Sequence, residues 1–335
     1  MAIRNNTQVQ DMTTAIERVP FKPGLISSMG LYRGVSVNAD AVTFDVRENS
    51  LAILDDHLRN VAQKNGMADR EYDIHTLAIP SYPIVNSIGR EKLAGLRGFG
   101  KEAQETVAAA VAEELERQAE RHDVHYEYLA SLMTMTGQID TTHYGLINAA
   151  TEFGVSRPTQ SITDGSVAAD LRAAQSKSKA GLMNGGRTQG YVVFAGADLF
   201  EAIVSSSDVA TAWQFAQGSQ MNPLRNELGT VASGYTMFRF GNTDIILYED
   251  TFQDKEGNVI TPLATDAGVM VPRTELGRAW FGPASTLSAL GTPGSRRFAQ
   301  TYRDPKDRYI EVESEQNVLL LAEQFGATVE LSIGV

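Results

Sequence analysis

Hydrophobic and polar residues first alternate clearly between residues 41 and 80. Val42, Phe44 and Val46 alternate with polar side chains, and a similar alternation returns in YDIHTLAIP, residues 72–80. A period of two is typical of a half-buried β-strand. The polar stretch between the two alternations predicts a long two-stranded ribbon with a polar tip. Because such a ribbon is marginally stable alone in water, we expect it to pack on another part of the protein or on another copy.

A helical period replaces this pattern after Gly100. Strong helix formers fill the segment, and Gly137 is a natural end for it. The stripe that recurs every three or four residues consists of Val107, Val111, Leu115, Gln118, His122, Tyr126, Leu129 and Met133. The spacing predicts one amphipathic helix of about seven turns. A single helix this long, preceded by a ribbon, does not fit a doubly wound sheet and favours an α+β fold.

The flanking regions contain shorter elements. Residues 1–34 show little periodicity and many prolines and glycines, which predicts an extended arm that must lie on something to be ordered. We expect Asp164 to cap a helix over 167–183, and a second helix over 197–215 to break near 205–208. Strand patterns cover 138–154, 191–196, 235–250, 258–264, 267–273 and 308–335, the last as one long strand or a strand pair.

Composition narrows the classes of protein. The chain has 335 residues, a net charge of −12 and no cysteine. The acidic balance argues against a broad basic surface for nucleic acid. Without cysteine there is no disulfide, thiolate nucleophile or Cys-ligated zinc. The polar N-terminus lacks a signal core, and no apolar run approaches the ~20 residues of a membrane span. We therefore expect a soluble protein that matures in a reducing cytosol, without membrane contact.

The glycines of RGFGKEA, residues 97–103, resemble a dinucleotide-binding turn. That turn needs a buried strand before the glycines and an acidic residue about 20 positions later, at the end of a second strand. Here a charged, helix-like segment precedes them, and the acidic candidates lie within the long helix. We interpret Gly95, Gly98 and Gly100 as a sharp backbone turn between the ribbon and the helix.

A histidine pair on the long helix is the strongest candidate metal site. His122 and His125 are three residues apart with Asp123 between them, and such a pair can share a metal ion. A metal-dependent hydrolase that uses these residues is therefore one alternative. No second ligand pair has suitable spacing, HExxH is absent, and the other histidines are isolated. We expect core and surface histidines instead.

The remaining carboxylates and serines also favour a structural role. We expect the glutamates Glu113, Glu114, Glu116 and Glu120 to be solvated on the helix surface, beside Arg117. The acidic loop with Asp250, Asp254, Glu256 and Asn258 misses the EF-hand spacing and reads as a hairpin turn over KEGN, residues 255–258. No nucleophile elbow and no P-loop is present. The sequence thus predicts no catalytic, cofactor-binding or metal residue, and no enzyme.

The order of elements is more informative than any single motif. An extended arm, a long ribbon, a long helix and a mixed domain that ends in strands follow one another. The segments that carry the comparison are FKPGLISSMGLYR (21–33), LAGLRGFG (93–100), DVHYEYLASLMTMTGQI (123–139), GVMVPRTELGRAWFGPAS (268–285) and YRDPKDRYIEVESEQNVLLLAE (302–323). In this order and spacing, the chain resembles the lambda-type major capsid protein E family of tailed phages over nearly its whole length.

The resemblance implies a Hong Kong 97-type capsid fold with an N-terminal arm (1–34), an extended loop or E-loop (35–88), a peripheral domain with a spine helix (89–165), an axial domain (166–300) and returning C-terminal strands (301–335). It also implies pentamers and hexamers that close into an icosahedral head around packaged DNA, without sequence-specific DNA binding. The protein would belong to the virion and reside in the host cytoplasm during assembly.

Further partners follow from the same resemblance. Some relatives carry a scaffolding segment of about a hundred residues, and the 34-residue arm is shorter than that, so a separate scaffolding protein is implied. A portal protein is expected, and a decoration protein is a further candidate. Another phage structural protein, such as a tail-tube or decoration subunit, is the second alternative, although the long helix argues against a tube subunit.

Overall fold

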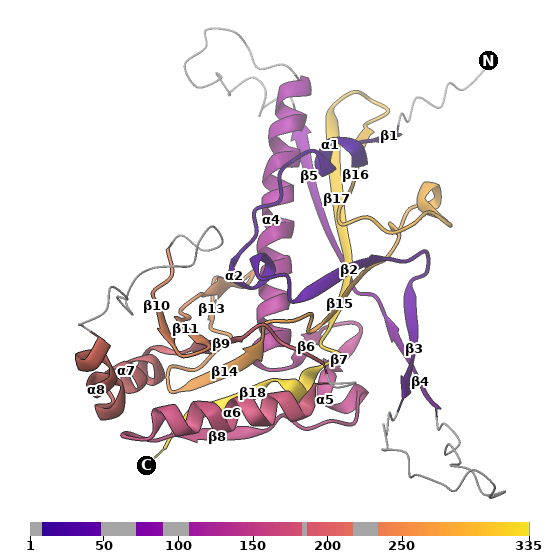
Figure 1. Ribbon diagram of the computed structural model, residues 1–335. Helices are drawn as coiled ribbons and strands as arrows, with labels where there is room; N and C mark the ends of the chain where they lie inside the picture. Colours follow the sequence, from indigo (N-terminus) through magenta and orange to yellow (C-terminus); the bar gives the residue numbers. More distant parts are fainter. Residues whose placement is uncertain (1–8, 48–71, 90–106, 183–185, 217–233, 335) are drawn as a thin grey trace, which may run out of the picture.

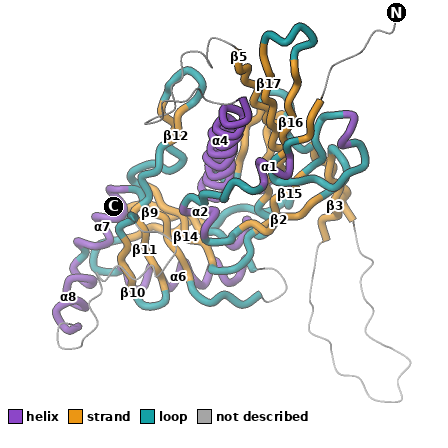
Figure 2. Tube along the Cα trace, turned by 90° about the horizontal axis from the view of Figure 1, so that it is seen from above, coloured by secondary structure: helices purple, strands orange, loops and turns teal. Residues whose placement is uncertain are grey.

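The computed structural model describes residues 9–47, 72–89, 107–182, 186–216 and 234–334. The long helix α4, Val107–Met135, stands at the centre of these residues (Figure 1). One sheet runs alongside it and a second sheet lies across its C-terminal end, as the view from above also shows (Figure 2). The turn glycines of 95–100 fall outside the described residues.

The sheet beside α4 is built around one long strand. In the described residues this sheet has the order β1-β16-β17-β15-β2, and β5 also pairs with β17. Its strands are β1 (Val9–Asp11), β2 (Tyr32–Ser36), β5 (Ser81–Gly89), β15 (Gly277–Phe281), β16 (Phe298–Arg303) and β17 (Tyr309–Leu321). The first part of β17 pairs with β5 and β16, and its last residues pair with β15. A single strand therefore aligns the whole sheet with α4.

The second sheet is mixed and has helices on its surface. Its order is β10-β11-β9-β14-β18-β8. Its strands are β8 (Thr159–Ile162), β9 (Tyr191–Ala195), β10 (Met237–Phe240), β11 (Thr243–Leu247), β14 (Ala267–Pro272) and β18 (Val329–Ile333). Helices α6 (Val167–Gly181) and α7 (Ala197–Ser205) share a buried core with this sheet. Another core runs from β17 and α4 into β9, β11 and β14, so the two sheets form one body.

The main sequence predictions for helices and strands are confirmed. Helix α4 buries its predicted stripe from Val111 to Met133, although Val107 is exposed. It ends before Gly137, whose φ of 72° lies in the left-handed region. The helical segment 197–215 breaks at Ser206 into α7 and α8 (Ser207–Ala216). The last segment, predicted as one long strand or a strand pair, forms two strands, β17 and β18, which lie in different sheets.

The predicted ribbon is also confirmed. Strands β3 (Ala41–Arg47) and β4 (Tyr72–Ala78) pair antiparallel from Ala41–Ala78 to Arg47–Tyr72. They form a separate two-stranded sheet in the described part of the chain, and they extend away from the body (Figure 1). The predicted polar tip, 48–71, lies outside the described residues.

The arm prediction needs correction. Residues 9–34 are not a bare extended strand, because they form β1, α1 (Thr13–Glu17), α2 (Leu25–Ser28) and the start of β2. Ile16, Leu25 and Ile26 are almost fully buried against the same chain. This part of the arm is therefore a packed element of its own subunit.

Asp164 caps a helix, but not the one that the sequence predicted. Helix α6 begins after Ser166, which makes no side-chain cap hydrogen bond. The Asp164 carboxylate instead accepts a hydrogen bond from the amide of Ser207, at the start of α8, at 2.9 Å. The Asp208 carboxylate accepts one from the amide of Ala168, near the start of α6, at 3.0 Å. The two aspartates thus cap each other's helices, because the break at Ser206 brings both helix starts together.

The remaining elements are short. The predicted strand over 138–154 divides into the hairpin β6 (Gln138–Thr141) and β7 (Gly145–Asn148) and the helix α5 (Ala149–Glu152), because the Asn148 side chain caps that helix. Other short elements are β12 (Phe252–Gln253), β13 (Val259–Ile260), η2 (Leu287–Ala289) and η3 (Phe325–Ala327). No helix in the described ranges is long and apolar enough to cross a membrane.

We predict that Gly277→Ala destabilises the body. A Cβ atom on Gly277 would lie 2.0 Å from the carbonyl oxygen of Leu321, where β15 and β17 meet. Because backbone cannot yield as a flexible side chain does, we expect the free energy of unfolding to fall by about 2 kcal/mol or more in chemical denaturation. Gly89→Ala is the matched control, since a Cβ there meets nothing within 4 Å. Equal stability of the two variants would contradict this close approach.

Candidate functional site

The three candidate metal ligands on α4 point to different partners. His122 Nε2 lies 2.9 Å from Ser314 Oγ on β17. Asp123 pairs with Arg297, and the His125 ring lies 4.2 Å from the ring of Tyr82. No group of three His, Cys, Asp or Glu side chains among the described residues could hold a metal ion. The structure therefore does not assemble the site that the metal-enzyme alternative requires.

His122 is fully buried and His125 is half-buried, and both are neutral. Burial lowers the pKa of His122 to about 3, with smaller contributions from His125 and Arg297, and burial lowers the pKa of His125 to about 4. Among the described residues, His125 Nε2 is a buried atom without a hydrogen-bond partner. At neutral pH these rings pack against β17 and β5 and carry no charge.

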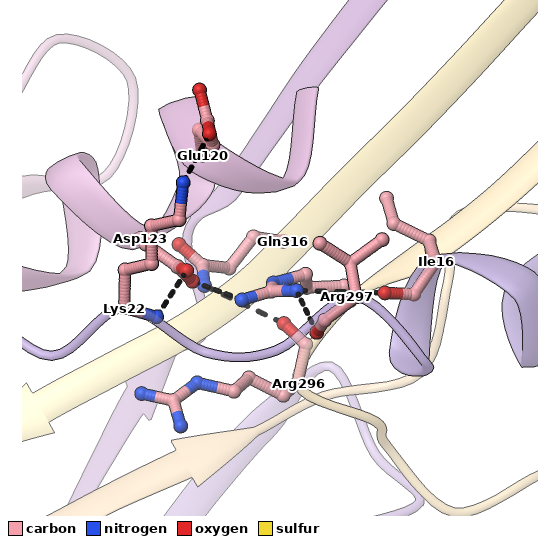
Figure 3. Close-up of polar contacts among 8 residues, drawn as sticks. Ile16, Lys22, Glu120, Asp123, Arg296, Arg297 and Gln316 are labelled. Atoms are coloured by element: carbon pink, nitrogen blue, oxygen red, sulfur yellow. Dashed lines mark hydrogen bonds and ion pairs between the residues drawn. The ribbon is translucent and has the colours of Figure 1, made fainter. Parts of the chain in front are cut away.

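The polar cluster around Asp123 and Arg297 attaches the arm to α4 (Figure 3). Their ion pair is almost completely buried, with each side chain only 3% exposed. Asp123 also accepts a hydrogen bond from the amide of Lys22 at 2.9 Å, and Arg297 donates to the Val19 carbonyl at 3.3 Å. Buried charges are costly unless they are paired and hydrogen-bonded. The arm backbone supplies those additional hydrogen bonds. The hydrogen bonds to the buried Asp123 and Arg297 therefore fix the position of the arm.

Glu127, one helical turn later, holds the next part of the arm. Its carboxylate accepts hydrogen bonds from the amides of Ile26, at 2.6 Å, and Ser27, at 2.9 Å. Burial raises the pKa of Glu127, and these hydrogen bonds act in the opposite direction. A Cβ atom on Gly24 would lie 2.3 Å from the Glu127 side chain. Glycine at position 24 therefore lets the arm approach the carboxylate closely.

An arginine stack completes this junction. The Arg296 guanidinium lies 3.3 Å from the centre of the Phe21 ring and 4.6 Å from that of the Tyr126 ring. Cation–π contacts of this kind are favourable when partly desolvated. The two adjacent arginines thus bind the arm in different ways. Arg296 contacts the Phe21 ring of the arm, and Arg297 binds the backbone of the arm.

The root of the ribbon has its own attachment to the body. The ring of Phe44 on β3 lies 5.6 Å from that of Phe153 and 6.2 Å from that of Trp280. His75 on β4 pairs with Glu152 of α5 at 2.8 Å. On the opposite face of β4, Ile74 is 67% exposed. The ribbon therefore leaves the body at a fixed angle with an apolar side chain facing outward.

Two predictions about carboxylates have different outcomes. Glu113 and Glu116 are exposed as expected, but Glu114 is buried, hydrogen-bonded to Asn86 and paired with Arg117. The expectation of a solvated Glu114 is wrong because α4 turns this residue toward β5. In the acidic loop, by contrast, Asp254 accepts hydrogen bonds from the amides of Glu256 and Asn258, both at 2.8 Å, so the predicted hairpin turn is confirmed.

The sequence analysis missed Asp123 and Glu127 as attachment points for the arm. Their spacing of four residues places both on one helix face, and that face runs beside the predicted buried stripe. Buried acidic residues at this spacing are a signal that a partner segment with free backbone amides is required. The partner itself could not be read from the helix.

Comparison with known proteins gives a consistent result. The sequence model of the family "Phage major capsid protein E" matches residues 8–333. The major capsid protein of Pseudomonas phage KPP10 is 26% identical and covers 95% of this chain and 94% of its own. The major capsid protein of Salmonella phage Felix O1 is 21% identical over 92% of this chain and 91% of its own. A solved structure described as the capsid protein of a prophage of E. coli CFT073 has a TM-score of 0.63 at 11% identity, covering 97% of this chain and all of the other. This likeness confirms the fold predicted from the sequence.

We predict that Asp123→Asn releases the arm. The substitution leaves the buried Arg297 without its charge partner, so we expect a loss of about 3–5 kcal/mol in the free energy of unfolding. Limited trypsin digestion should then cleave faster after Arg18, which Val19 follows. Glu120→Gln is the control on the same helix, because the Glu120–Lys22 pair is largely exposed and should matter little. Unchanged proteolysis of Asp123→Asn would contradict this attachment of the arm to α4.

We also predict a pH effect that His125→Phe reduces. The pKa of histidine is about 6.5 in an unfolded chain, so acid protonates the unfolded state first and stability falls as pH decreases from about 6.5 toward 4. Phenylalanine keeps the contact with Tyr82 and cannot be protonated. Between pH 7 and pH 5 the variant should lose about 2 kcal/mol less than the wild type. The free energy of unfolding is measured by urea titration at pH 7 and at pH 5. If the wild type and the variant lose equal amounts between these pH values, His125 is not a buried neutral group.

Proposed function

This chain belongs to the phage major capsid protein E family, and from that premise we propose that it assembles as pentamers and hexamers into an icosahedral shell that encloses packaged DNA. Family membership makes it a structural protein of the phage virion rather than an enzyme. The net charge of −12 supports a role in which the shell surrounds DNA without sequence-specific binding.

One observation carries the proposal, namely the ribbon of β3 and β4. In the described residues Val42, Phe44 and Leu77 pack on the core of the body and His75 pairs with Glu152. No third strand joins the ribbon in this part of the chain. An isolated two-stranded ribbon is marginal in water. A neighbouring subunit would cover the outward face around Ile74. The ribbon is thus the element that a single copy leaves incomplete.

We assign the domains as the resemblance implies: arm 1–34, extended loop 35–88, peripheral domain 89–165, axial domain 166–300 and returning strands 301–335. The last assignment is supported by β17 and β18, since the C-terminal segment contributes one strand to each sheet. The pairing of β5 with β17 favours an earlier end of the extended loop, before Ser81. A separate scaffolding protein, a portal protein and a decoration protein stay predictions from the resemblance.

Shortening the ribbon tests this function. Arg47 and Tyr72 are paired across β3 and β4, so an Asn-Gly turn can replace residues 48–71 and close the hairpin there. We expect a folded protein with a thermal midpoint near that of the wild type, because the cores of the body are formed by residues that this change retains. Co-expressed with a candidate scaffolding protein, it should form no closed shells in electron micrographs.

A point variant provides the matched comparison. Ile74→Asp places a charge on the outward face of the ribbon and should reduce shell yield, whereas Ile74→Thr keeps a β-branched side chain and should reduce it less. Normal shells from the shortened chain would overturn the assembly role of the ribbon.

A further inference from the structure

The loop between β15 and β16 exposes two leucines on an uncharged segment. Leu287 is 96% exposed and Leu290 is 85% exposed. Residues 279–295 contain no Asp, Glu, Lys or Arg, in a chain that is 21% charged. Large apolar side chains grouped on a surface without nearby charge mark interaction sites more often than isolated exposed residues do. We call residues 282–295 the leucine loop.

The leucine loop is held in a defined shape. Asn317 donates from its side chain to the Pro283 carbonyl at 2.5 Å, and the Gly294 amide donates to the Val37 carbonyl at 2.8 Å. A Cβ atom on Gly294 would lie 1.9 Å from the Phe281 carbonyl oxygen, so this close approach requires glycine. Both ends of the loop are thus fixed to the body. The leucines are presented by a built structure, and the fold itself leaves them uncovered.

A groove of suitable character lies between α4 and the β12–β13 hairpin. Its volume is about 780 Å³. The apolar part of its lining is formed by Val124, Tyr128, Phe252 and Ile260, and Val124 is exposed. The Tyr128 and Phe252 rings are 5.2 Å apart and form one wall. Charged side chains of both signs also line it, and an uncharged loop brings no further charge into this mixed set; they are Arg117, Glu120, Arg121, Asp254 and Lys255.

The leucine loop and the groove lie on opposite flanks of the molecule. The loop, orange in Figure 1, projects on the same side as β3 and β4, whereas the hairpin lies on the other side of α4. The view from above gives the same arrangement (Figure 2). The two surfaces therefore cannot meet within one copy. Matching surfaces on opposite flanks produce a head-to-tail contact, and such contacts close into rings or continue from copy to copy.

We propose that Leu287 and Leu290 of one copy dock into the groove between α4 and the β12–β13 hairpin of the next copy. This inference rests on the proposed function, because it names a contact that joins subunits. Burying two leucine side chains removes apolar surface from water, and each contributes at least a tenfold gain in association. The two leucines together should therefore strengthen association about a hundredfold.

Two complementary variants of the full chain test the docking. Leu287→Ser/Leu290→Ser removes the apolar tip, and Val124→Asp places a carboxylate in the groove. We expect each to keep the thermal midpoint of the wild type, because these side chains are exposed. In sedimentation velocity, each should associate about a hundredfold more weakly than the wild type. Val259→Ser is the control, since Val259 is exposed on the same hairpin outside the groove lining and should leave association unchanged.

Mixing the two defective proteins gives the decisive result. The leucine variant retains an intact groove, and the groove variant retains an intact leucine loop. A head-to-tail contact predicts 1:1 dimers in the mixture, while each protein alone stays monomeric. Wild-type association in either variant, a mixture without dimers, or a wild type that is monomeric at its highest soluble concentration would overturn the docking. Because the readout is pairwise association, dimers without closed shells would contradict the proposed shell and leave the docking intact.

Discussion

Helix α4 carries buried polar groups that need partners from other segments, and this need determines how the rest of the chain is arranged. This helix buries Asp123, Glu127 and His122, and each requires a specific partner because an unpaired buried charge or donor is costly. The partners come from the arm, from Arg297 and from β17. An apolar helix face would accept many arrangements of its neighbours, whereas these hydrogen bonds accept one. The body of the subunit is therefore specified by polar contacts around an apolar core.

This arrangement separates what one copy completes from what it leaves open. The described part of the arm is held by Asp123 and Glu127 of its own chain, so it does not depend on a neighbour for its structure. The ribbon and the leucine loop differ, because their roots are fixed while Ile74 and Leu287 remain exposed. In the proposed assembly, a subunit of this design folds first and then joins other copies through projections whose roots are already fixed. Preformed contacts reduce the ordering cost of each association.

The sequence predicted the elements whose pattern is long or strictly periodic. The stripe of α4, the alternation of β3 and β4 and the break at Ser206 were all recognisable. Strand β5 was missed because Pro83 lies within it and its pattern is mixed, although a proline is tolerated in a strand that pairs on one side. Helices α1 and α2 are too short for a helical period, and tertiary contacts rather than propensity hold them. The functions of Asp123 and Glu127 depend on a segment about 100 positions away in the chain, and a helical pattern carries no information about such a partner.

The central claim is that this capsid protein folds around its own arm and joins its neighbours through the ribbon. The most direct measurement is a cryo-electron microscopy map of shells assembled from the full chain. The account predicts density for residues 12–28 along α4 of the same subunit, and density for β3 and β4 lying over an adjacent subunit. A map in which the arm crosses to a neighbour's α4, or in which the ribbon folds back on its own body, would contradict the account.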